Sequence, residues 1–134
     1  MSLVVAGATA LAFTALAVVA NAGCPAVFAG TGGRVWLGTL ALASFLTIVA
    51  GILTLRGSHW AVVVGRASAG LASGLLVQPS SAMVFAVAVA VAALSSRRGP
   101  LAHRAAGALL LGVLGVVGYT LAFSPMVLGE PVRC

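Results

Sequence analysis

The sequence predicts an all-α integral membrane protein, a bundle of about five transmembrane helices with no soluble domain. Two observations lead to this fold class. Hydrophobic residues make up 62% of the 134 positions and charged residues only 6%, whereas soluble domains are about half apolar and about a quarter charged. The apolar residues also form runs close to the roughly 20 residues that a helix needs to cross a bilayer.

The first predicted span covers residues 3–22. Its apolar run ends in Ala20-Asn21-Ala22, which resembles the cleavage site of a signal peptide. No positive charge precedes the run, however, and Asn21 fits poorly into a lipoprotein motif before Cys24. We therefore expect the segment to be retained as a membrane span.

The second and last spans are clear apolar runs, over residues 35–55 and 105–123. Proline and several glycines precede the second span, so we expect a loop from Gly23 to Arg34. His103 and Arg104 come just before the last span and are expected to lie outside it. The whole chain, 1–134, is then a single transmembrane helical domain.

The stretch between Arg56 and Arg97 allows two interpretations, because it is too long for one span and short for two. A tight helical hairpin gives spans over residues 61–77 and 80–95, and five spans in total. Alternatively, a surface helix precedes one long, proline-kinked span over residues 71–94. That arrangement has four spans.

The distribution of arginine favours five spans, because arginine near span ends accumulates on the cytoplasmic side. With a cytoplasmic N-terminus, five spans place four arginines on that side: Arg56, Arg97, Arg98 and Arg104. Only Arg34 and Arg133 then lie outside. Four spans would divide the arginines almost evenly between the two sides.

The net charge of +6 does not predict binding to nucleic acid, because the arginines lie singly or in pairs between apolar runs. We interpret them as topology signals that contact lipid headgroups, which makes the lipid bilayer an expected partner. The chain has no lysine and is rich in residues with GC-rich codons: Ala, Val, Gly, Leu and Arg. We therefore expect a multi-pass protein of a bacterial cytoplasmic (inner) membrane.

The scarcity of reactive side chains excludes most enzyme classes. Without lysine there is no Schiff base, and Glu130, the single acidic residue, leaves no carboxylate pair or intramembrane carboxylate relay. The sequence has no lysine-containing phosphate loop and no HExxH motif. The absence of CxxC argues against a thiol-redox enzyme. We expect no catalytic residue, no metal site and no cofactor.

Arg66 is the sharpest single feature, because the five-span topology places it about a turn and a half inside the third span. Insertion of an arginine at mid-bilayer costs about 2.5 to 3.5 kcal/mol, and less near the end of a span. This cost suggests a contact with an anionic lipid or solute, or with an acidic residue of a partner chain. The simpler interpretation is that the long side chain snorkels to the cytoplasmic headgroups.

His59 and His103 lie at the cytoplasmic ends of the third and fifth spans, at similar depth. Two histidines on facing helices can ligate a haem or a metal ion, which makes this pair the haem candidate of the sequence. Both residues are at the polar boundary, where a histidine needs no ligand to explain it. The simpler interpretation is therefore a pair of histidines without a cofactor.

Cys24 and Cys134 share the outer face in the five-span topology, in a compartment that is oxidising in bacteria. A disulfide between them requires Cα atoms within about 7 Å of each other. Two free thiols are the other alternative, and two cysteines alone form no metal site.

Small residues at helical spacing predict close helix packing. Gly70 and Gly74 form a GxxxG motif, and the last span carries a row of small residues: Ala108, Gly112, Gly115, Gly118 and Ala122. Such faces let helix backbones approach closely in lipid. We expect them to pack within the chain, with docking to another subunit as the alternative. Trp36 and Trp60, at span ends, are expected to be interfacial anchors.

Two functions fit these features. The first is a non-catalytic integral subunit or scaffold of a larger membrane complex, such as a respiratory, secretion or transport assembly, held by lateral helix contacts with other subunits. The alternative is a small homo-oligomeric carrier or channel for a small solute, which is anionic if Arg66 selects it. No convincing internal repeat supports transport.

Overall fold

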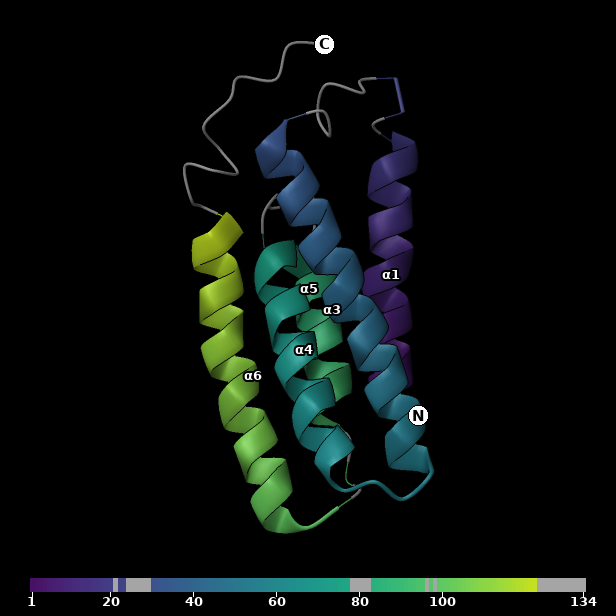
Figure 1. Cartoon of the computed structure of the whole chain (residues 1–134), viewed down its shortest axis with the longest axis vertical. Helices are drawn as coiled ribbons and strands as arrows, with labels where there is room; N and C mark the ends of the chain where they lie inside the picture. Colours follow the sequence, from purple (N-terminus) through teal and green to yellow (C-terminus); the bar gives the residue numbers. More distant parts are fainter. Residues whose placement is uncertain (21, 24–29, 78–82, 96, 98, 123–134) are drawn as a thin grey trace.

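The computed structural model of the protein describes residues 1–20, 22–23, 30–77, 83–95, 97 and 99–122. These residues form five α-helices and no strand: α1 (Ser2–Ala20), α3 (Thr31–Leu55), α4 (Trp60–Leu76), α5 (Met83–Leu94) and α6 (Leu101–Ala122). The helices run alternately up and down in one bundle (Figure 1). The predicted all-helical fold with five helices is therefore confirmed.

One end of the bundle is where α1, α4 and α6 begin and where α3 and α5 end (Figure 1). Three described arginines lie there, Arg56 just after α3, Arg97 after α5 and Arg104 in the first turn of α6. We call it the arginine end. At the opposite end, the part of the chain that the structure describes holds one arginine, Arg34, on α3.

Three of the helices are long and apolar enough to cross a membrane, namely α1, α3 from Gly32 onward, and α6. The other two, α4 and α5, are shorter apolar helices of 17 and 12 residues. At a rise of 1.5 Å per residue they are about 26 and 18 Å long. The structure thus has three candidate spans by length and composition, where the sequence predicted five.

The central helix is α4, which packs against α1, α3, α5 and α6 (Figure 1). It ends at Leu76, and α5 begins at Met83 and runs antiparallel to it. The four-span alternative required a surface helix and one long helix over residues 71–94, and both features are wrong for these helices. Close packing against four neighbours makes α4 the most enclosed helix of the bundle.

Two helices, α3 and α6, begin about one turn earlier than predicted, at Thr31 rather than 35 and at Leu101 rather than 105. The expected loop to Arg34 ends at Gly30, whose extended backbone (φ −70°, ψ 155°) precedes the first turn of α3. His103 and Arg104, expected outside the last span, lie in the first turn of α6, where the Arg104 N–H donates to the carbonyl of Pro100 at 3.1 Å. Hydropathy marks where apolar side chains begin, whereas backbone hydrogen bonds decide where a helix begins.

The contact between α4 and α6 depends on glycine. A Cβ atom at Gly70 would collide with the backbone of Leu111, and one at Gly74 with the carbonyl oxygen of Gly115. A Cβ atom at Gly118 would lie 2.6 Å from the carbonyl oxygen of Leu71. We call Gly70, Gly74, Gly115 and Gly118 the glycine interface.

Gly112 does not take part in this interface, although the sequence placed it in the same row. A Cβ atom built on Gly112 has nothing within 4 Å. Successive helical residues are rotated by about 100°, so Gly112 is turned away from α4 when its neighbour Leu111 faces it.

The contact between α1 and α3 uses two glycines that sequence reasoning did not single out. A Cβ atom at Gly7 would lie 2.9 Å from the backbone nitrogen of Ile48, and one at Gly51 would lie 2.8 Å from that of Val4. Across the next contact, between α3 and α4, the hydroxyls of Thr47 and Ser68 are hydrogen-bonded at 2.9 Å. Close backbone approach therefore recurs throughout the bundle.

Gly74→Ala should destabilise the protein, because the added methyl group forces α4 and α6 apart. We expect a loss of about 1 to 3 kcal/mol in the free energy of unfolding. Gly112→Ala adds the same methyl group in open space, and alanine favours helix by up to about 1 kcal/mol over glycine. Unfolding in detergent, followed by far-ultraviolet circular dichroism, measures both variants. An equal loss in the two would contradict the close contact at Gly74.

Candidate functional site

Arg66 is a charged residue enclosed within the bundle, with 3% of its surface exposed. Its guanidinium donates from Nη1 to the carbonyl oxygen of Arg104 at 2.6 Å, and from Nη2 to that of Leu94 at 3.1 Å. Leu94 is the last residue of α5, and Arg104 lies in the first turn of α6. We call these three residues the arginine junction, because one side chain of α4 ties together the adjoining ends of two other helices.

Helix geometry explains why Arg66 reaches these carbonyls. Side chains of an α-helix tilt toward its N-terminus, so Arg66 extends from the second turn of α4 toward the arginine end. Glycine at position 107 makes room on α6, because a Cβ atom there would lie 2.8 Å from Cδ of Arg66. The carbonyl of Leu94 has no donor within its own helix, and a guanidinium is a strong donor to it. Arg66 therefore caps the C-terminus of α5.

The direction of the Arg66 side chain agrees with snorkelling, but its end lies among helices rather than at the outer surface. Sequence reasoning singled out Arg66 by the cost of its charge and missed both of its backbone acceptors. No sequence signal identifies a carbonyl at the end of a neighbouring helix. A contact of Arg66 with an anionic lipid, a solute or a partner chain stays a prediction.

Trp36 provides a second cap of the same kind. Its indole Nε1 donates to the carbonyl oxygen of Leu75 at 3.1 Å. Leu75 lies in the last turn of α4, where carbonyls also lack donors within the helix. Trp36 is half-buried between helices, whereas Trp60, the other predicted anchor, is exposed at the start of α4. The ends of both short helices are thus held by donors from neighbouring helices.

The two histidines lie at the arginine end. His59 is the exposed N-cap residue of α4 and makes no capping hydrogen bond with its side chain. The half-buried ring of His103 packs edge-on against Trp60, with centroids 4.8 Å apart and an angle of 86° between the rings. Haem ligation by the pair stays a prediction. Among the described residues there is no group of three or more metal-binding side chains.

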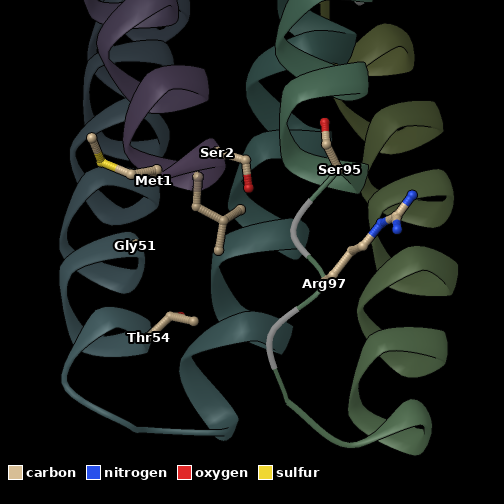
Figure 2. A pocket seen from close by; sticks show the side chains of 7 residues that line it. Met1, Ser2, Gly51, Thr54, Ser95 and Arg97 are labelled. Atoms are coloured by element: carbon tan, nitrogen blue, oxygen red, sulfur yellow. The ribbon is translucent and has the colours of Figure 1, made fainter.

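A cavity of about 260 Å³ lies at the arginine end, between the start of α1, the end of α3 and the segment after α5 (Figure 2). Its lining consists of Met1, Ser2, Leu3, Gly51, Thr54, Ser95 and Arg97. The hydroxyls of Thr54 and Ser95 already donate to backbone carbonyls, and the side chain of Arg97 extends away from α1 (Figure 2). The cavity is smaller than the roughly 300 Å³ at which ligand pockets usually begin, so it suits only a small group.

Cys24, Cys134 and Glu130 lie outside the described residues. The choice between a disulfide and two thiols therefore stays open, as does any role of the single acidic residue. The part of the chain that the structure describes contains no aspartate or glutamate. The charges of the described side chains at the arginine end are consequently all positive, which suits anions.

Comparisons with protein-family models, with curated proteins and with solved structures find no match for this chain. Its function is therefore argued from its own geometry. That geometry offers buried hydrogen bonds that tie helices together, an apolar outer surface and one cationic end.

Arg66→Gln should loosen the arginine junction, because the shorter side chain leaves the carbonyl of Leu94 without its donor and removes the second donor of the Arg104 carbonyl, which keeps its donor within α6. Each unsatisfied group costs about 1 to 3 kcal/mol, and removal of a buried charge offsets part of this cost. We expect a net loss of about 2 kcal/mol in the free energy of unfolding. Hydrogen exchange should become faster in the last turn of α5.

Arg34→Gln is the matched control, since Arg34 is exposed at the opposite end. Its free energy of unfolding should change by less than about 0.5 kcal/mol. If Arg66→Gln keeps both the stability and the exchange pattern of the unmodified protein, the junction does not hold the end of α5.

Proposed function

We propose that this chain is a membrane-embedded, non-catalytic subunit or scaffold of a larger membrane complex. The observation that carries the proposal is the contrast between the two sides of the helices. The buried polar side chains on their inner sides donate hydrogen bonds within the bundle, and their outer sides expose large apolar side chains. The bundle therefore presents lateral surfaces to lipid and to other helices.

The outer surface supports membrane embedding. Large apolar side chains are exposed along the outer helices, including Val84 on α5 (77% exposed) and Leu109 on α6 (70%). The exposed described arginines lie at or beyond the ends of helices, at Arg34, Arg56 and Arg97. Soluble monomers rarely expose apolar patches beyond a few hundred Å². Lipid is the solvent that matches such a surface.

The interior supports a structural role over a carrier. The buried hydroxyls of four residues each donate to the carbonyl four positions earlier: Thr14, Ser44, Thr47 and Thr54. Arg66, the residue expected to select an anion, donates to two carbonyls. These donors are engaged inside the bundle, so they provide little for a solute to bind. A pathway between several copies of the chain would need other residues.

The helix best placed for a lateral partner is α6. It packs mainly on α4 and leaves Leu109, Val113 and Val116 exposed. Gly112, which has open space around it, lies among these residues. A helix from another subunit that replaced lipid here would gain packing contacts.

Gentle extraction from the native membrane, followed by mass spectrometry of the intact assembly, tests the proposal. We expect the chain in the membrane fraction, together with larger subunits in a fixed ratio. A photo-crosslinking residue at exposed position 109 should capture one of these subunits, whereas the same residue at buried position 69 should not. A homo-oligomer without another chain would contradict the subunit role and favour the carrier. Recovery in the soluble fraction would contradict membrane embedding.

A further inference from the structure

The arginine end carries an excess of positive charge that the described residues do not neutralise. Arg56, Arg97 and Arg104 lie at this end, and the Arg66 side chain reaches toward it. Like charges gathered at one place create a positive potential that attracts anions.

Within this end, two side chains at the start of α6 have a shielded nitrogen that meets no hydrogen-bond partner among the described residues. Arg104 is half-buried, and its Nε is shielded from solvent without a hydrogen-bond partner among the described residues. The same is true of Nδ1 of His103. The backbone at Arg104 is held in place, because its carbonyl accepts from Arg66. The half-buried side chain of Arg104 thus extends from an anchored backbone, and no acidic side chain among the described residues balances its charge.

The surroundings of Arg104 are apolar on the outer side of the bundle. Trp60, whose ring contacts His103, is 71% exposed, and Leu101 in the first turn of α6 is 76% exposed. Tryptophan at a helix end is typical of the boundary between hydrocarbon and headgroups. Arg104 follows His103, whose ring contacts an exposed tryptophan, and lies one turn after the exposed Leu101. Such a combination of cation and apolar side chains matches a phospholipid, which joins a phosphate to acyl chains.

We propose that the start of α6 binds the phosphate of an anionic phospholipid, with Arg104 as the phosphate ligand and Trp60 and Leu101 beside the apolar part of the lipid. Guanidinium donates two parallel hydrogen bonds to phosphate oxygens, which gives this contact its specificity. Arg66 acts as the positioning residue, because it holds the backbone of Arg104. The inference rests on the proposed membrane embedding and adds a particular lipid class to it.

The test is a titration of the purified full-length chain in detergent with phosphatidylglycerol and with phosphatidylcholine of the same acyl chains. Native mass spectrometry counts the bound lipids, and the midpoint of thermal unfolding reports stabilisation. We expect binding of phosphatidylglycerol about tenfold tighter than of phosphatidylcholine, and a loss of at least about fivefold in Arg104→Gln. Arg104→Lys should be intermediate, because lysine meets phosphate as a single point charge.

Arg56→Gln is the matched control, since Arg56 is an exposed arginine of the same end. It should change the affinity for phosphatidylglycerol less than about twofold. Equal losses of affinity for phosphatidylglycerol in Arg56→Gln and Arg104→Gln would mean that positive charge in general, rather than a site at Arg104, attracts the lipid. That result would overturn the proposal. No preference for phosphatidylglycerol would also overturn it.

Inorganic phosphate is the second probe, because it shares the recognised group without acyl chains. Stabilisation by millimolar phosphate equal to that by the lipid would overturn the assignment to a lipid. The side chain of Arg104 makes no part of the arginine junction, so Arg104→Gln should keep the helical content of the bundle. Recovery of the chain in the membrane fraction together with partner subunits tests the proposed function separately. That result can hold even when the preference for phosphatidylglycerol is absent.

Discussion

The carbonyl groups at the ends of α4 and α5 set the main constraint on this bundle. A helix leaves its last carbonyls without donors, and an apolar surrounding has no water to supply them. Here Trp36 donates to Leu75 and Arg66 donates to Leu94. Both donors come from neighbouring helices, so the two short helices are completed by the bundle rather than by their own sequence. Their positions are therefore inseparable from those of α3 and α4.

Close approach of the backbones makes these bonds reachable. Gly70 and Gly74 let α6 lie directly on α4, and Gly107 admits the stem of Arg66 between them. Larger residues at these positions would push α6 away from α4. The carbonyl of Arg104 would then lie too far from the guanidinium of Arg66 to accept its hydrogen bond. Helix packing and hydrogen bonding between helices therefore depend on each other in this bundle. The small residues bring the helices together, and the buried donors fix how the helices sit along one another.

Much of the architecture was predictable, because hydropathy and arginine spacing are properties of single segments. They predicted an all-α chain with five helices, and the cost of burying a charge singled out Arg66. The starts of α3 at Thr31 and of α6 at Leu101 were predicted too late, because the helical hydrogen bonds begin before the apolar run does. The acceptors of Arg66 and the place of Gly107 were missed for another reason. Each depends on which helices become neighbours, and no single segment contains that information.

The arginine junction links the end of α5 to the start of α6 through one side chain of α4. One guanidinium bonds to both α5 and α6, so loosening either helix weakens the hold on the other. Native proteins open locally in contiguous cooperative units, which often coincide with neighbouring elements of this kind. A change at the glycine interface that moved α6 would also move the Arg104 carbonyl, which shares the Arg66 guanidinium with the end of α5. Because Arg66 precedes both of its acceptors in the chain, α4 already carries the donor that completes the end of α5 and the contact to the start of α6.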